Sequence, residues 1–278
     1  MNTLKVIILL ASLSGLLMLV GYFVARGTGV VIALVLSAIM NFGSYWYSDS
    51  IVLRMYSAKE VTQEQAPVLH KAVESLSAKA KIPKPRVYVI AGETPNAFAT
   101  GRDEDHAAVA VTSGILKILN KDELEGVIAH ELSHIKHRDI LISTMAATVA
   151  SAVVLLSRWA VFFGNDEGKG MIPAIATAIV APIAATVIQM AISRSREYEA
   201  DAGSARITGR PESLASALRK LSYASKVKPM AANPSTAHMF IVNPLSGNFV
   251  MNLFSTHPPA EKRIERLLQM KAAQAKRD

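Results

Sequence analysis

Residues 127–145 read VIAHELSHIKHRDILISTM. The stretch contains two histidines at helical spacing and leads directly into an apolar segment. His130 and His134 stand four positions apart, so both imidazoles lie on one helix face and can bind the same metal ion. Glu131 lies one step round the helix, where a carboxylate can act as general base on the attacking water. The stretch therefore predicts a zinc-dependent site for amide hydrolysis next to a membrane segment.

The helix that carries this motif has a predicted start. Asn120 can cap it, with Glu123 three residues later, and an apolar stripe follows. We expect the helix to continue toward the apolar segment from residue 140. The motif HExxH alone also occurs by chance, and histidines at helical spacing are often surface residues. A third ligand on another element has to support the metal site.

That third ligand is predicted at Glu197. Glu197 and Asp201 stand four positions apart and share a helix face, whereas Glu199 lies about 200° round the helix from Glu197. Asp201 can then accept the second ring N–H of a ligating histidine, which we expect to be His130. The alternative is an exposed acidic helix end, neutralised by neighbouring arginines. Arg194 and Arg196 are assigned no catalytic role.

Four apolar segments of about 20 residues predict transmembrane helices, at residues 6–25, 29–47, 140–163 and 171–192. They form two hairpins, the first closed by residues 26–28. The alternatives are a cleaved signal peptide for the first segment and a buried core hairpin for the second pair. We therefore divide the chain into a transmembrane hairpin (1–48), a catalytic part (49–139), a second hairpin (140–192) and a second catalytic part (193–278).

The net charge of +8 follows the same division. Twelve Lys and Arg lie between residues 51 and 139 and fourteen follow residue 192, whereas the two hairpin loops carry only Arg26 and Lys169. This asymmetry predicts that the catalytic parts and both termini face the cytoplasm. The basic residues are not gathered into one tract with aromatics, so no nucleic-acid partner is expected. With no cysteine, disulfides and thiolate metal sites are excluded.

The segments outside the apolar runs predict an α-rich α+β fold. Residues 62–82 have the pattern of an amphipathic helix with a capping box at Thr62, and a basic amphipathic helix is expected from residue 259. Two β-prone runs, residues 85–90 and 107–111, predict a small antiparallel sheet, separated by a turn-rich segment. Residues 226–259 are predicted as a long mobile loop, either a substrate lid or an inert connection.

At this point the chain resembles a known family, the HtpX-type membrane zinc endopeptidases, which are related to the CAAX prenyl endoproteases. The residues that carry the resemblance are HELSH at 130–134, EYEAD at 197–201, PNAFA at 95–99 and STHPP at 255–259, arranged around two apolar hairpins. The resemblance implies a gluzincin-like cytoplasmic catalytic domain with one zinc ion per chain, completed by Glu197. Co²⁺ and Mn²⁺ could occupy the same ligands.

The resemblance also implies residues that bind substrate. Asn96, Ala97, Phe98 and Ala99 belong to a segment beside the cleft in which a peptide lies extended. His257 matches a histidine near the cleft that could stabilise the tetrahedral oxyanion. Arg263 could pair with substrate or with Asp201, or be an ordinary surface arginine, and it is not included as catalytic.

The implied function is cleavage of misfolded or damaged membrane proteins, or of unfolded polypeptides, at cytoplasmic segments. The implied place is the inner membrane of a bacterium, with several spans in the lipid bilayer. Two other functions stay open: a dedicated processing protease of the CAAX type, and a membrane chaperone without catalysis. No oligomeric state is predicted.

Overall fold

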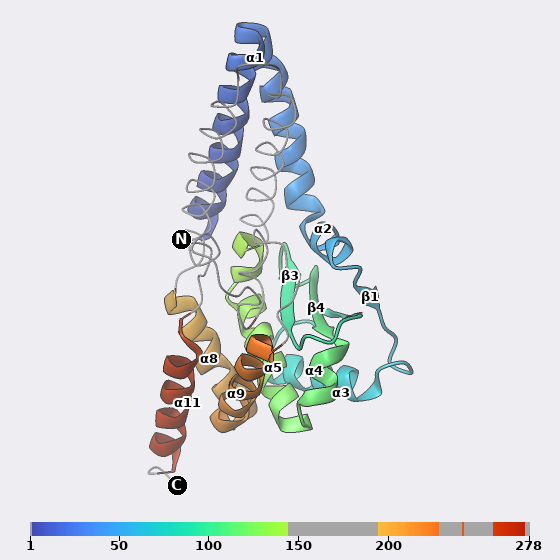
Figure 1. The fold of residues 1–278 in the computed structure, drawn as a ribbon, viewed down its shortest axis with the longest axis vertical. Helices are drawn as coiled ribbons and strands as arrows, with labels where there is room; N and C mark the ends of the chain where they lie inside the picture. The colour runs from blue at the N-terminus through green and yellow to red at the C-terminus, as the bar shows by residue number, and fades with distance from the viewer. Residues whose placement is uncertain (1, 144–193, 228–240, 242–257, 276–278) are drawn as a thin grey trace.

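A helical hairpin stands on a helix-rich body that contains one small sheet (Figure 1). The computed structural model describes residues 2–143, 194–227, 241 and 258–275. Helix α1 (Asn2–Trp46) forms the hairpin. The body consists of α2 (Ser48–Met55), β1 (Lys59–Glu60), α3 (Pro67–Ala80), β2 (Arg86–Ile90), β3 (Ala97–Gly101), β4 (Ala107–Thr112), α4 (Ser113–Ile118), α5 (Lys121–Lys136), α8 (Arg194–Thr208), α9 (Pro211–Val227) and α11 (Ala260–Gln274).

The two limbs of α1 are antiparallel, and the chain reverses where the predicted link begins. Ala25 and Arg26 leave helical geometry, Arg26 with a φ of 47°. Gly21 and Gly29 face each other so closely that a Cβ on either would overlap the backbone of the other. Farther along, the Asn41 side chain donates to Ser14 Oγ across the limbs, at 2.9 Å. Small residues and an interhelical polar contact are typical of packing in a membrane.

Among the described residues, one helical segment is long and apolar enough to cross a membrane, Ala25–Gly43. Only 17% of it is buried within the protein, so it is not a core helix. Leu10–Leu19 in the first limb is apolar but shorter. Of the four predicted transmembrane helices, the described residues thus offer one candidate and one shorter apolar segment. The second predicted hairpin, residues 140–192, lies outside the described residues from residue 144 on.

The sheet is mixed, so the prediction of an antiparallel sheet was wrong for its central pair. Its strand order is β1-β2-β4-β3. Strands β2 and β4, the two that the sequence predicted, pair in parallel, while β1 with β2 and β3 with β4 are antiparallel.

The error came from strand β3, which lies inside the segment predicted as turns. Its sequence AFATG combines Phe98 and Thr100 with two alanines and a glycine, which are depleted in strands, so its strand signal is weak. The chain runs back along β3 and turns again at Gly101, whose φ is 142°, before entering β4. Two reversals between β2 and β4 leave those strands pointing the same way.

Helix α5 is the centre of the body and the part of the fold that the sequence predicted best. The expected cap is confirmed: Asn120 Oδ1 accepts from the Glu123 N–H, and Glu123 Oε2 accepts from the Asn120 N–H, both at 2.9 Å. Its apolar stripe packs between α3, α9 and one face of the sheet. The opposite face of the sheet packs on α2.

Two helix boundaries differ from the expectation. Helix α3 begins at Pro67, not near Thr62, because the Thr62 N–H donates to Gln65 Oε1 in a turn that precedes the helix. Helix α5 ends at Lys136, since Arg138 has a φ of 57°, and helical backbone resumes only at Asp139. The predicted loop 226–259 lies mostly outside the described residues, and the basic helix expected after it is α11.

Candidate metal and catalytic site

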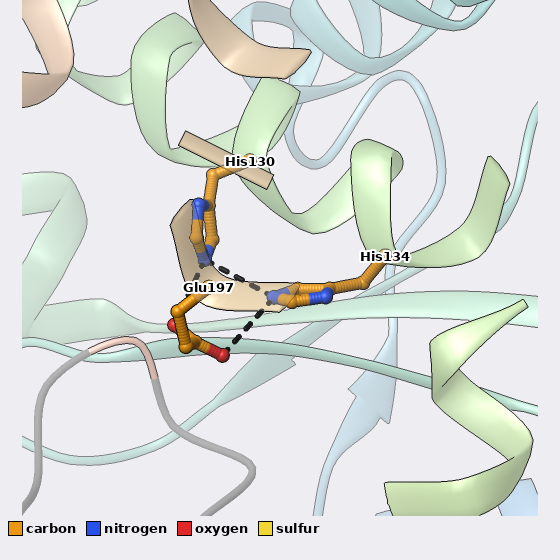
Figure 2. Close-up of side chains that lie close together, drawn as sticks. All are labelled: His130, His134 and Glu197. Atoms are coloured by element: carbon orange, nitrogen blue, oxygen red, sulfur yellow. Dashed lines mark hydrogen bonds and ion pairs between the residues drawn. The ribbon is translucent and has the colours of Figure 1, made fainter. Parts of the chain in front are cut away.

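Helices α5 and α8 bring His130, His134 and Glu197 together, as Figure 2 shows. The Nε2 atoms of the two histidines are 3.2 Å apart. Glu197 Oε2 lies 3.7 Å from His130 Nε2, and Glu197 Oε1 lies 3.5 Å from His134 Nε2. One ligand atom from each residue falls within 4.8 Å of the others. His130 and Glu197 are buried, and His134 is partly exposed.

The close approach of the two helices depends on glycine. A Cβ on Gly203 of α8 would overlap the Ser133 hydroxyl of α5, so only glycine allows this separation. One residue on, Ser204 Oγ donates to the carbonyl of Gly126 at 2.7 Å. This packing sets the distance of Glu197 from the two histidines.

These three residues fit a divalent metal ion. Two imidazoles and one carboxylate are a usual catalytic zinc set, which leaves a fourth position for water or substrate. Burial lowers the pKa of His130 to about 4, which keeps its imidazole neutral, as a ligand must be. Burial also lowers the pKa of His134, but Asp139, Glu197 and Glu131 outweigh it and raise that pKa to about 9. The same carboxylates favour a metal cation between the ligands.

His130 has the carboxylate neighbour that was predicted for it. Asp201 Oδ1 lies 3.0 Å from His130 Nδ1, on the side of the ring away from the ligand cluster. With Nδ1 as donor, Nε2 is left to bind a metal. Glu199, which was predicted to point elsewhere, is exposed.

Arg263 is the residue that the sequence analysis undervalued. Its side chain is 2% exposed and donates to both oxygens of Asp201, from Nε at 2.9 Å and from Nη2 at 2.7 Å. Its Nη1 lies 3.5 Å from Glu197 Oε2 and donates to the Ile241 carbonyl. Burial raises the pKa of Asp201, but Arg263 and His130 outweigh it and lower that pKa to about 2. The alternative of a surface arginine was wrong.

Glu131 lies beside the cluster and is 3% exposed. Burial raises its pKa to about 7, and Glu197 adds to this, although His134 and the backbone N–H of Ala99 act in the other direction. The edge strand β3 thus contacts the predicted base directly. A carboxylate in this setting can accept a proton close to neutral pH.

The four residues predicted to bind substrate all belong to β3 or its start. Asn96 Oδ1 accepts from the Ala97 N–H, and Asn96 is 2% exposed. Phe98 packs on the α2 side of the sheet, away from α5. The carbonyl of Ala97 accepts from the Ile241 N–H on the outer edge of the strand. His257, predicted to stabilise the oxyanion, lies outside the described residues.

Two further contacts near the ligands, both made by Asp139, escaped the sequence analysis. Asp139 Oδ2 lies 3.4 Å from His134 Nδ1, and Asp139 Oδ1 lies 3.1 Å from Arg196 Nη1. Asp139 is five positions after His134, which is off the helical spacing of four, so its contact depends on the break at Arg138. No spacing rule could have indicated it.

Comparison with known proteins agrees with this site. The model of peptidase family M48 matches residues 63–271, which contain all three candidate ligands. The chain is 55% identical over 275 residues to a protein of Desulforapulum autotrophicum named Protease HtpX homolog, covering 96% of this chain and 89% of that protein. It is also 55% identical over 268 residues to a protein of the same name from Pyrococcus furiosus, covering 94% and 93%.

A solved structure has a similar fold. The crystal structure of Ste24p from S. mikatae aligns with a TM-score of 0.54 at 16% sequence identity. The alignment covers 96% of this chain and 64% of that one, so the chain spans less than two thirds of the larger protein. At this identity the likeness concerns the fold alone.

Proposed function

The chain belongs to peptidase family M48 and is a metalloprotease, and from this premise we propose that it is a membrane-bound zinc endopeptidase. Its substrates are misfolded or damaged membrane proteins, which it cleaves at cytoplasmic segments in protein quality control. The observation that carries the proposal is the cluster of His130, His134 and Glu197 beside the buried carboxylate of Glu131. A structural zinc site is usually closed by four protein ligands and has no use for a base.

In the proposed mechanism His130, His134 and Glu197 hold the metal. A bound zinc ion would polarise the scissile carbonyl and make water acidic enough to lose a proton near neutral pH. Glu131 takes that proton while the water oxygen attacks the scissile carbonyl carbon, and the C–N bond breaks as Glu131 passes the proton to the leaving amine. Because water is the nucleophile, no covalent acyl-enzyme forms. The backbone N–H of Ala99 favours the ionised form of Glu131. Asp201 and Arg263 hold the His130 ring.

Substrate is proposed to lie extended beside β3, next to the hydrogen bond that the Ala97 carbonyl accepts from the Ile241 N–H. Support comes from the place of β3 at the edge of the sheet and from its contact with Glu131. Asn96 and Phe98 are buried, so recognition here would rely on the peptide backbone. Recognition of that kind accepts many sequences, as an enzyme for unfolded polypeptides needs. The oxyanion role of His257 stays a prediction.

The lipid bilayer is the proposed surroundings of the α1 hairpin. Ala25–Gly43 exposes large apolar side chains along its length, which water would disfavour and lipid would not. We propose a bacterial inner-membrane protein with several spans, residues 1–48 and 140–192 forming hairpins. The catalytic parts, residues 49–139 and 193–278, then face the cytoplasm together with both termini, as the distribution of Lys and Arg favours.

The deciding experiment compares proteolysis of an unfolded protein by detergent-purified wild type and by Glu131→Gln, at matched zinc content. The substitution removes the base and spares the ligands, so activity should fall about 10²–10⁴-fold. Glu74→Gln, the same change on an exposed residue of α3, is the matched control. If Glu131→Gln cuts as fast as wild type, Glu131 is not the base, and a non-catalytic chaperone becomes the better account.

The substrate class needs a separate comparison. Wild type is given an unfolded membrane protein and, in parallel, a lipidated CAAX peptide. Faster cleavage of the unfolded protein is expected. Cleavage confined to the lipidated peptide would favour the dedicated processing protease instead.

A further inference from the structure

Asp139 is a buried carboxylate to which the proposed mechanism gives no part. Its side chain is 7% exposed, and the residue lies three positions past the end of α5. The left-handed backbone at Arg138 stops the helix, and the next residue faces back toward His134. A buried charge is unfavourable unless an opposite charge pairs with it.

Its two oxygens have different partners. Oδ2 lies 3.4 Å from Nδ1 of His134, and Oδ1 lies 3.1 Å from Nη1 of Arg196. Arg196 is 12% exposed and directly precedes Glu197 in α8. Asp139 therefore joins a histidine on the first helix to an arginine beside the third candidate ligand on the second helix.

The other histidine has the same arrangement around it. Nδ1 of His130 faces Asp201, and Asp201 is held in turn by Arg263. Each candidate histidine ligand thus has a carboxylate on the nitrogen turned away from the cluster, and each carboxylate has an arginine behind it. A carboxylate in this place fixes which ring nitrogen carries the proton and how the ring is oriented.

We propose that Asp139 and Arg196 are a positioning pair for His134. Asp139 accepts the Nδ1–H of His134, which turns Nε2 toward His130 and Glu197, and Arg196 holds the Asp139 carboxylate in place. The proposal rests on the metal site proposed above. Because Arg196 adjoins Glu197, the pair also links the end of α5 to the start of α8. One contact thus helps to orient two of the candidate ligands, His134 and Glu197.

The test measures zinc affinity by competition with a chromophoric chelator, on the detergent-purified full chain. The variants are Asp139→Ala, Asp139→Asn and Arg196→Gln, with Arg196→Lys as the conservative change. We expect 10–100-fold weaker zinc binding for Asp139→Ala, a typical loss when such a partner is removed, and a smaller loss for Arg196→Lys than for Arg196→Gln. The visible spectrum of Co²⁺-loaded Asp139→Asn should shift from that of wild type.

The matched control is Asp103→Asn. Asp103 also pairs with a histidine, His106, at 2.6 Å, but both are exposed and lie outside the ligand cluster. It should bind zinc as wild type does. Asp139→Asn keeps the side-chain volume, so it decides the question if Asp139→Ala does not fold.

Two results would contradict the proposal in different ways. If Asp139→Asn binds zinc within twofold of wild type with an unchanged Co²⁺ spectrum, the pair is only an ion pair between helices, whatever happens to the melting temperature. If His130→Ala and His134→Ala bind zinc as wild type does, the proposed metal site itself is wrong, and the positioning role fails with it.

Discussion

Buried charge at this site is balanced residue by residue. Glu197 and Asp201 lie against Arg263, and Asp139 lies against Arg196, with all three carboxylates and both guanidinium groups largely shielded from water. Removing one partner of such a pair leaves the other buried and unpaired, which costs more than the pair itself contributes. The arginines are therefore as much a part of the site as the carboxylates that they hold.

Arg263→Gln should strongly destabilise the protein. The change leaves Asp201 and Glu197 without their buried cation, at a cost of about 3–5 kcal/mol. Thermal unfolding in detergent measures it, with Arg266→Gln as the control: Arg266 lies on the same helix, is exposed, and stacks on Tyr198, a contact worth about 0.5–1 kcal/mol. Equal losses in the two variants would mean that the buried pairs contribute little.

Some of these residues could be found from the sequence and some could not. His130, His134, Glu197 and Asp201 occur in pairs spaced four apart on single helices, so the period of the helix brings each pair to one face. Arg263 meets Asp201 across 62 positions, and Asp139 meets His134 through a helix break. No local period encodes either contact.

Among the elements, α5 and α8 set the positions of the candidate ligands. They pack so closely at Gly203 that a larger side chain would not fit between them. Gly203→Ala should separate them and cost about 1–3 kcal/mol, since Cβ would overlap Ser133. Zinc affinity should fall as well, because Glu197 moves with α8. The control is Gly43→Ala in α1, where Cβ meets open space, and it should be neutral or slightly stabilising. Unchanged unfolding and zinc binding for Gly203→Ala would show that the helices adjust freely.

The start of α5 gives a pH-dependent prediction. Burial raises the pKa of Glu123, but hydrogen bonds from Lys220, the Asn120 N–H and Ser216 outweigh it and leave that pKa below its usual 4.5. Since the folded-state pKa is lowered, the stabilisation is fully present above the unfolded pKa and is lost as pH falls through the folded value. Glu123→Gln should therefore cost about 1–3 kcal/mol at pH 7.

That difference from wild type should shrink as pH falls below about 4.5, the value from which the Glu123 carboxylate is shifted. Unfolding curves of both proteins across pH measure it, beside Glu265→Gln, an exposed glutamate of α11, as the control. A difference that does not change with pH would rule out an ionic origin.

The direction in which the strands of the sheet pair could not be predicted from the individual elements. The predicted strands β2 and β4 both exist, but their relative direction depends on β3, which carries almost no strand signal of its own. Helix α5, by contrast, was predicted with its cap because capping residues and an apolar stripe are local features. Local signals thus located helix α5, and the long-range pairing of the sheet could not be derived from them.

At the scale of the whole molecule, the apolar hairpin and the polar body require different surroundings. In Ala25–Gly43, Val35 and Ile39 are 56% and 64% exposed and stand four positions apart, on one face of the helix. The double variant Val35→Arg and Ile39→Arg should lower membrane retention in alkaline extraction, since each arginine near a helix centre costs about 2.5–3.5 kcal/mol.

The control for that experiment is Val68→Arg, a change at a residue that is 60% exposed in α3 of the body. It should stay in the membrane fraction with wild type. Full retention of the double variant would mean that this limb of α1 does not lie in lipid, and the proposed topology would have to be revised.

The central claim is that His130, His134 and Glu197 hold one zinc ion, and metal analysis with zinc-edge X-ray absorption on the purified full chain tests it most directly. We predict one zinc per chain with two imidazole nitrogens at about 2.0–2.1 Å and carboxylate or water oxygens at about 2.0–2.2 Å. Zinc should be lost in His134→Ala and weakened in Glu197→Gln. The account would be contradicted if the wild-type protein bound no zinc. It would also be contradicted if both variants bound zinc with the same spectrum as wild type.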